Sequence, residues 1–467
     1  MKAPVTLIKG DEIGIETDYR EALPVNMFAV EKQILGAEGY MLQCDGLTDF
    51  AIGEGKDRAG VYNDRFRKHY RLSGTQFIEV AVDGTTTNLG TISGLSQARL
   101  ESFYSFNTQG IIADGKFYLY GASEGFQEVT DPDLGEPIDG VWIDGYYFMT
   151  DGEYIFHTDI TDESSIDPLK FATAEFMPDD SKGLSKSQDN KVMVWGRYTL
   201  EYFINAATEN FAFSRVSTRA QKIGIVATHA KCEAKGVFYI LGGRKDEAVS
   251  AHQVILGAAR NIATREVDKI IAQYSEPELS DVRVESRTDK DITFVLFHLP
   301  NETLCYNQTV AQKFGVSVAW TQLKSTGNNY NAINGVFDAR NAFWIYGDKE
   351  DTNIGKLDDT VCTHYGELVE WELFSPFLNL TEFSIDEISL EIVPGHTSFI
   401  GGTVALSFTY NGVTYGTETW LAYGGPSEYS HRFIVRRLGY VSNWVGIKLR
   451  GISKTKMAFA LMEVTYS

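Results

Sequence analysis

The only close pairs of histidine and cysteine in this chain are His229 with Cys232 and Cys362 with His364. Thiolate sulfur and imidazole nitrogen are zinc ligands, but a zinc site needs three or four of them. Neither pair has a second pair at metal-binding spacing, so we interpret all four residues as core or surface residues. The sequence therefore predicts no metal site and no cofactor.

Catalytic motifs are equally scarce. We find no G-x-S-x-G, Walker A or H-E-x-x-H sequence, and no G-x-G-x-x-G that follows a strand. Asp131–Glu136 resembles the start of a calcium loop but lacks the third oxygen ligand and the glutamate at the twelfth position, so we interpret it as a solvated acidic loop. Because the two carboxylates of a glycosidase can be distant in sequence, a glycosidase stays open as an alternative.

Charge is distributed very unevenly along the chain. Residues 121–189 contain 17 Asp/Glu and three Lys, in a protein of net charge −21. Residues 431–456 contain seven Lys/Arg and no carboxylate. Such separation suggests surfaces with different partners, because net charge acts on association rather than on fold. The acidic candidates are Glu124, Glu128, Asp131, Asp133, Glu136 and Asp139. The basic candidates are Arg432, Arg436, Arg437, Lys448, Arg450, Lys454 and Lys456.

A shorter basic run, Arg65–Arg71, alternates cations with aromatic residues. This pattern could fit nucleic acid, but we favour a strand at an exposed sheet edge, where long cationic side chains prevent unwanted pairing. The four cysteines are far apart and form no C-x-x-C pair, which favours reduced, mostly buried thiols. The apolar run Ala3–Ile8 is too short for a signal peptide, and no 18-residue apolar span occurs.

The elements that position these residues are predicted to be strands. A strand–turn–strand unit recurs, with Asp-Gly turns at 114–115, 144–145 and 151–152. Runs such as Val237–Leu241 are continuously apolar, which indicates that both faces of the strand are covered. Stacked sheets that repeat at about 40–55 residues are typical of β-propeller blades. The expected blade cores include Phe117, Tyr118, Phe148, Val194, Phe238, Ile240, Phe294 and Trp344.

We therefore expect an all-β protein with three parts. Residues 1–58 form an N-terminal segment that closes onto the propeller. Residues 59–360 form a propeller of six or seven blades, with a short helical insertion at 260–275, where apolar residues follow a period of about 3.6. Residues 365–467 form an antiparallel, sandwich-like domain with Asn411-Gly412 as a hairpin turn. An array of β-sandwiches is the competing interpretation.

Several short segments, spread across nearly the whole chain, form a recognisable ordered set. They are Leu23–Met27, Gly39-Tyr40, Thr158–Ser164, Leu200–Phe203, Lys269–Ile271, His298–Pro300, Phe374–Pro376, Gly412–Gly416 and Gly446–Arg450. In this order they resemble one family, the tail nozzle or packaged-DNA stabilisation proteins of short-tailed phages. The departures from the family lie mainly in loops and in the acidic segment.

This resemblance implies a structural virion protein without enzymatic activity, made in the host cytoplasm without a signal peptide. It implies six copies in a ring below the head-to-tail adaptor, with a tail needle or plug in the opening and tailspikes or fibres around the outside. The ring would close the channel after packaging, retain the genome and conduct double-stranded DNA during ejection without binding it specifically.

The charge pattern fits a nozzle of this kind. DNA carries one negative charge per roughly 1.7 Å of axis, so a channel that must pass it should be acidic or neutral. The acidic candidates are then expected near the channel, and the basic stretch at a protein interface. Strand alternation should place Lys448 and Arg450 on one face, and we expect Arg437 to act with them. A propeller glycosidase or lectin for host polysaccharide remains the alternative.

Overall fold

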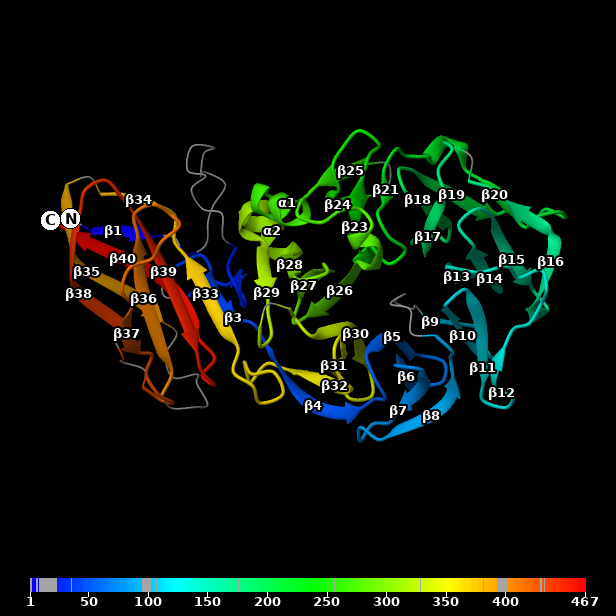
Figure 1. Ribbon diagram of the computed structural model, residues 1–467, viewed down its shortest axis with the longest axis horizontal. Helices are drawn as coiled ribbons and strands as arrows, with labels where there is room; N and C mark the ends of the chain where they lie inside the picture. The colour runs from blue at the N-terminus through cyan, green and yellow to red at the C-terminus, as the bar shows by residue number, and fades with distance from the viewer. Residues whose placement is uncertain are drawn as a thin grey trace.

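The fold consists of two all-β domains that lie side by side in the computed structural model, a propeller and a smaller sandwich (Figure 1). The structure describes residues 2–5, 7, 23–34, 36–94, 102–105, 107–174, 176–255, 258–327, 329–380, 382–392, 401–428, 431 and 433–467. Both chain ends lie at the far edge of the sandwich, away from the propeller (Figure 1).

Seven antiparallel sheets form the propeller, and six of them pair strands from one continuous stretch of the chain, whereas blade 7 takes one strand from elsewhere. Blade 1 contains β5 (Asp57–Asn63), β6 (Lys68–Ser73), β7 (Gln76–Val80) and β8 (Thr86–Thr91). Blade 2 contains β9 (Ser102–Tyr104), β10 (Thr108–Ala113), β11 (Lys116–Gly121) and β12 (Gly125–Glu128). Blade 3 contains β13 (Asp139–Ile143), β14 (Tyr146–Thr150), β15 (Ile155–Asp159) and β16 (Asp162–Ala172). Blade 4 contains β17 (Ser181–Lys186), β18 (Val192–Gly196), β19 (Leu200–Asn205) and β20 (Phe213–Arg215).

Blade 5 contains one strand more than the other blades, because two short strands both pair with the same long strand. It contains β21 (Gly224–Ile225), β22 (Lys231–Ala234), β23 (Val237–Gly243), β24 (Ser250–Ile255) and β25 (Ala258–Asn261). Blade 6 contains β26 (Arg283–Asp289), β27 (Ile292–His298), β28 (Thr303–Asn307) and β29 (Trp320–Leu323). Blade 7 contains β30 (Ala332–Asp338), β31 (Phe343–Asp348), β32 (Asn353–Asp358) and β4 (Gly46–Ile52).

Blade 7 takes its outer strand from the N-terminal segment, and this closes the ring of blades. β4 pairs antiparallel with β32, so that Asn353 lies opposite Ile52. The chain then enters blade 1 at β5, which packs against β30 of blade 7. This closure gives seven blades, one of the two numbers that the sequence left open.

Two of the three Asp-Gly pairs form the expected two-residue turns. Asp114 and Gly115 both have positive φ, as a type I′ turn requires, and they join β10 to β11. Asp144 and Gly145 do the same between β13 and β14. The third pair begins a longer loop, because Thr150 lies opposite Ile155.

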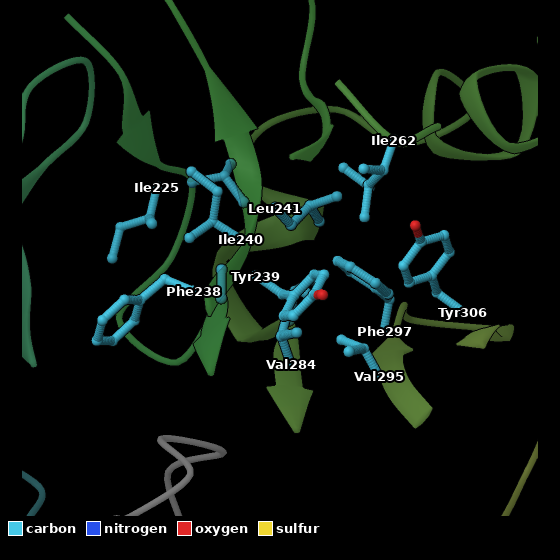
Figure 2. Close-up of a cluster of buried hydrophobic side chains, with 14 of the residues drawn as sticks. Ile225, Phe238, Tyr239, Ile240, Leu241, Ile262, Val284, Val295, Phe297 and Tyr306 are labelled. Atoms are coloured by element: carbon cyan, nitrogen blue, oxygen red, sulfur yellow. The ribbon is translucent and has the colours of Figure 1, made fainter. Parts of the chain in front are cut away.

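The expected blade cores are confirmed with one adjustment. Six of the seven residues of β23 are buried, which explains its continuous apolar run. Figure 2 shows Phe238 and Ile240 on the side of Ile225, and Tyr239 and Leu241 on the opposite side, toward Val284 and Phe297 of blade 6. Trp344 is only partly buried, and its indole N–H donates to the carbonyl of Thr288 at 3.3 Å.

The helical insertion is shorter than the sequence pattern indicated. α1 covers only Arg265–Ile271, and residues 258–261 belong to β25. The expected helix began too early, because the apolar spacing that predicted it also included the end of that strand. A second helix, α2 (Gln308–Phe314), was missed. Its signal was present, because the side chain of Asn307 caps the helix by accepting a hydrogen bond from the backbone N–H of Val310.

The sandwich consists of two antiparallel sheets. One contains β1 (Lys2–Val5), β2 (Met27–Val30), β3 (Tyr40–Gln43), β40 (Ala458–Tyr466), β35 (Phe383–Ile392) and β38 (Phe433–Val441). The other contains β33 (Glu370–Phe374), β34 (Leu378–Asn379), β39 (Trp444–Ile452), β36 (Thr403–Thr409) and β37 (Thr419–Ala422). The expected Asn411-Gly412 hairpin is instead part of a longer loop between β36 and β37, in which the Asn411 side chain accepts from Val413 and Thr414 N–H groups.

The N-terminal segment therefore serves both domains, with β1, β2 and β3 in the sandwich and β4 in the propeller. β2 is buried on both of its faces. Met27 and Ala29 contribute to the core of the sandwich. Phe28 and Val30 contribute to a propeller core of blades 6 and 7. One strand thus belongs to both cores, which couples the two domains rigidly.

Candidate functional site

The basic stretch is divided between the two sheets of the sandwich. Arg436 and Arg437 lie on β38, an edge strand of one sheet, whereas Lys448 and Arg450 lie on β39 in the other sheet. The expectation that Lys448 and Arg450 share a face is confirmed by their contacts with β33. Arg437 does not lie beside them on β39, because it belongs to the other sheet, and its joint action with them stays a prediction.

Carboxylates from other strands neutralise the charges on β39. Lys448 forms an ion pair with Glu372. Arg450 lies between two carboxylates and contacts Glu370 at 2.8 Å and Glu418 at 2.7 Å. The hydrogen bonds that Arg450 donates to the Glu418 carboxylate raise the pKa of Arg450, and the same contacts lower the pKa of Glu418.

Aromatic rings complete this face. The Arg450 guanidinium lies 5.2 Å from the ring centre of Trp420. The Lys448 ammonium lies 5.4 Å from Phe374 and 5.5 Å from Tyr415. Cations held by both carboxylates and aromatic faces are fixed in place, so this face is a stabilised surface of the sandwich rather than a cluster of free positive charge.

The remaining basic candidates differ in exposure. Arg436 is exposed although it forms an ion pair with Glu387 at 2.8 Å, and Arg437 and Lys454 are also exposed. Lys456 forms an ion pair with Asp45, which precedes blade 7's outer strand. Arg432 lies outside the described residues. Among the described basic candidates, the exposed cations are therefore Arg436, Arg437 and Lys454.

Four of the acidic candidates are exposed on blade 2 or on its connection to blade 3. Glu124 directly precedes β12 and Glu128 ends it, and Glu128 pairs with Lys116 at 2.8 Å. Asp133 and Glu136 follow in the connection. Asp131 is partly buried, and its carboxylate accepts hydrogen bonds from the backbone N–H groups of Asp133 and Ile166, which fix the loop.

Asp139 does not lie on this surface, which corrects its expected place near the channel. Its side chain is 1% exposed and forms an ion pair with Lys231 at 2.7 Å. The same carboxylate accepts from the backbone N–H of Leu184, so one group connects blade 3 to blades 4 and 5. An acidic loop and a buried ion pair look alike in sequence, because Lys231 is distant along the chain.

A second buried pair connects blade 1 to blade 7. Arg71, from the run that we expected at an exposed edge, is fully buried and contacts Asp57 at 2.7 and 2.9 Å. The amide of Asn334 donates to the same carboxylate. Burial raises the pKa of Asp57, whereas Arg71 and Asn334 oppose this shift. The edge interpretation of Arg71 is wrong because β6 is an interior strand of its blade.

A polar cavity of about 720 Å³ lies at the ends of blades 1, 6 and 7. Two of its cations form ion pairs, Lys56 with Glu350 at 3.1 Å and Arg58 with Asp114 at 2.6 Å. His298, also in its wall, contacts Glu285 at 2.9 Å.

The histidine and cysteine pairs occupy ordinary packing positions. His364 is buried, and its Nδ1 lies 2.8 Å from the Ser325 hydroxyl. Cys362 is buried and donates to the carbonyl of Ser453 at 3.4 Å. Within the described ranges, no three His, Cys, Asp or Glu side chains lie close enough together to hold a metal ion.

Comparison with known proteins assigns both domains. Residues 2–362 match the family described as Bacteriophage P22 Gp10, beta-propeller. The chain therefore belongs to the P22 Gp10 family. Residues 370–467 match the second domain of this family, described as Bacteriophage P22 Gp10, beta-sandwich. The boundary between the matches agrees with the end of blade 7 and the start of β33.

A relative within the Gp10 family is the tail hub protein gp10 of Salmonella phage P22. It is 26% identical over 469 residues, which cover 96% of this chain and 95% of the relative. The protein is thus a structural component of a phage tail. No helix in the part of the chain that the structure describes is long and apolar enough to cross a membrane.

Solved propellers resemble the fold more distantly. A streptogramin B lyase has a TM-score of 0.43 at 12% identity and covers 67% of this chain and 96% of its own. A virginiamycin B lyase from Staphylococcus aureus has a TM-score of 0.43 at 10% identity, over 67% of this chain and 98% of its own.

Proposed function

We propose that this protein is the hub of a short phage tail, in which six copies form a ring that closes the DNA channel after packaging and conducts the genome during ejection. The observation that carries this proposal is the match to both Gp10 domains, in order, along nearly the whole chain. In this role the ring joins the head-to-tail adaptor to a tail needle and to tailspikes or fibres, and it has no enzymatic activity.

The shared strand β2 supports a mechanical role. A ring that retains pressurised DNA must transmit force between its parts without hinge motion. Because β2 contributes side chains to both cores, a displacement of one domain relative to the other would expose apolar surface of both. The two domains of each subunit therefore move as one body.

The exposed acidic residues support passage of DNA without binding. Glu124, Asp133 and Glu136 are accessible and carry the sign that repels phosphate. A net charge of −21 per copy strengthens this repulsion, which salt screens beyond about 10 Å. Glu128 is a weaker candidate because Lys116 offsets its charge. Asp131 supports this acidic surface indirectly, because its carboxylate fixes the loop that carries Asp133.

The accessible cations Arg436, Arg437 and Lys454 are proposed to contact protein, namely an adaptor or a neighbouring copy. A cationic grip on DNA within the channel would retain the cargo that the tail must release. The test is negative-stain imaging of the purified protein mixed with its adaptor, where a six-fold ring with a central hole is expected. Particles without such a ring, under conditions in which both proteins are folded, would disprove the proposal.

Charge reversal examines the cations directly. Arg436→Glu, Arg437→Glu and Lys454→Glu together should slow ring formation, with an effect that shrinks at high salt. A matched control reverses three exposed lysines elsewhere, Lys32, Lys222 and Lys245. If the first variant assembles normally but loses salt-dependent DNA affinity, these cations contact phosphate instead. Hydrolysis of host polysaccharide by the purified protein, abolished by one carboxylate substitution, would favour a glycosidase.

A further inference from the structure

The outer strand of blade 3 contains an unusual bulge. β16 pairs with β15 so that Phe156 lies opposite Phe171, and Thr158 lies opposite Ile166. One residue on β15 therefore faces four on β16, the segment 167–170. Bulges of this kind bend the strand and re-aim its side chains. Here the bulge carries Pro168 and Leu169 away from the sheet.

Polar contacts hold the bulge in a fixed shape. The carboxylate of Asp167 accepts a hydrogen bond from the backbone N–H of Leu169 at 3.0 Å. The ammonium of Lys170 contacts Asp159 at 3.2 Å and Asp167 at 3.3 Å, which ties both ends of the bulge together. The conformation of Leu169 is thus organised before any partner arrives, which lowers the entropic cost of binding.

This bulge presents apolar side chains to solvent. Leu169 is 80% exposed and Phe171 is 50% exposed. The ring of Phe171 makes an edge contact with Tyr154 at 5.2 Å, and Tyr154 is itself exposed. We call Tyr154, Leu169 and Phe171 the blade-3 knob. The outer strands β8 and β25 carry no exposed large apolar residue among the described residues, and β4 carries Ile52 alone. Clustered exposure of this kind marks an interaction site.

Carboxylates lie beside the knob in the chain, because Asp151 and Glu153 directly precede Tyr154. Further carboxylates, among them Asp162 and Glu163, line a hollow of about 660 Å³ at the start of the same strand β16, together with Arg65. Lys170 does not offset this charge, because Asp159 and Asp167 already pair with it. A partner must therefore bring cations to the rim while it covers the apolar centre.

We propose that the blade-3 knob docks into an apolar pocket, rimmed by Lys and Arg, on a tail protein other than the hub. This inference rests on the proposed function, because it assigns a surface to one of the hub's partners. A second copy of the chain is the less suitable occupant, since the accessible cations of its basic stretch lie on the sandwich and are already proposed to contact the adaptor or a neighbouring copy. The bulge also removes the regular edge that strand addition would need, so side chains carry the contact.

The test uses Leu169→Asp in the phage that encodes this protein, with virions purified and their tail proteins quantified by mass spectrometry. A charged group in the centre of an interface of this type should weaken docking by at least about 30-fold. We expect the hub at its wild-type copy number and one other tail protein reduced. That protein, purified and titrated onto the purified hub, should bind Leu169→Asp at least about 30-fold more weakly.

Two further variants separate the effect of the rim charge on binding from a general effect of charge on the outer strands. Glu153→Lys should weaken the same binding at low salt and much less at high salt, because it removes rim charge only. Ile52→Asp places the same charge at an exposed apolar position, 69% exposed, on the outer strand of blade 7 and should leave tail composition unchanged. If Leu169→Asp reduces the folded yield, Leu169→Gln serves in its place.

Several results would overturn the inference. Wild-type composition and titre for Leu169→Asp would show that the knob is not an interface. Loss of the hub itself from virions, with the soluble variant still folded, would assign the surface to a second copy. Loss of the same tail protein in Ile52→Asp would indicate a general effect of charge on the outer strands. Absence of the wild-type hub from tails would instead refute the proposed function.

Discussion

Removing the carboxylate of Asp139 should destabilise the whole protein. In Asp139→Asn the ammonium of Lys231, only 4% exposed, keeps the carbonyl of Thr228 but loses its opposite charge. Breaking a buried ion pair from one side costs about 3–5 kcal/mol, because the remaining charge is uncompensated. Since the two domains share β2, they should unfold together.

The corresponding change in melting temperature follows from chain length. Unfolding entropy is about 2.1 cal/mol/K per residue, or roughly 1 kcal/mol/K for 467 residues. The variant should therefore melt about 3–5 °C lower than the wild type. Differential scanning calorimetry measures this shift, and the exposed neighbour provides a control, because Glu136→Gln should change stability by less than about 0.5 kcal/mol.

The double variant Asp139→Asn with Lys231→Met separates charge from packing. Removing both charges leaves no uncompensated ammonium in the interior, so the double variant should lose less stability than the sum of the single variants. A melting temperature of Asp139→Asn within about 1 °C of the wild type would refute the argument. Asp139 would then be solvated in the protein, as an acidic residue near the channel would be.

Other perturbations probe the cores and the domain junction. Phe238→Ala should cost about 3–5 kcal/mol in thermal unfolding, and an unchanged melting temperature would mean that β23 is wrongly placed. Burial lowers the pKa of His364 to about 4. Between pH 6.5 and 4 its imidazole is therefore protonated in the unfolded chain but neutral in the folded chain. Stability is then full above pH 6.5 and falls by about 2–3 kcal/mol on acidification to pH 4; denaturant titrations should show a smaller fall for His364→Gln. Asn26→Gly tolerates the φ of 51° but removes the side-chain bonds to the carbonyls of Lys324 and Glu370, which should cost about 1–3 kcal/mol. An unchanged melting temperature would show that these bonds do not hold the domains together.

The apolar runs were sufficient to predict the blades, because a strand covered on both faces, such as Val237–Leu241, has a recognisable composition. The number of blades depended on β4, which pairs with a strand about 300 positions away, and no local pattern reports such a pairing. The buried ion pair of Asp139 with Lys231 was missed for the same reason. Asp139 and Lys231 are separated by 92 positions, and each looks solvated in its own segment.

The basic stretch shows that strand register decides which charges of a segment are neutralised. Between 431 and 456 no carboxylate offsets the seven cations. Antiparallel pairing of β39 with β33 nevertheless places Glu372 diagonally across from Lys448, and Glu370 near Arg450. Charge that is separated along the chain is thus neutralised across the sheet, and only Arg436, Arg437 and Lys454 of the described candidates stay accessible.

The pairing of the chain's first strand with its last has a consequence for synthesis. Lys2 lies opposite Thr465, so the sheet that contains β1, β2 and β3 cannot be completed until β40 has left the ribosome. β4 likewise waits for β32 before the ring of blades can close. Contacts this remote in sequence slow folding, and they make it depend on the finished polypeptide. A prematurely terminated chain therefore exposes unpaired strands and apolar faces, and is directed to chaperones and proteases before it can compete with intact subunits for a place in the tail.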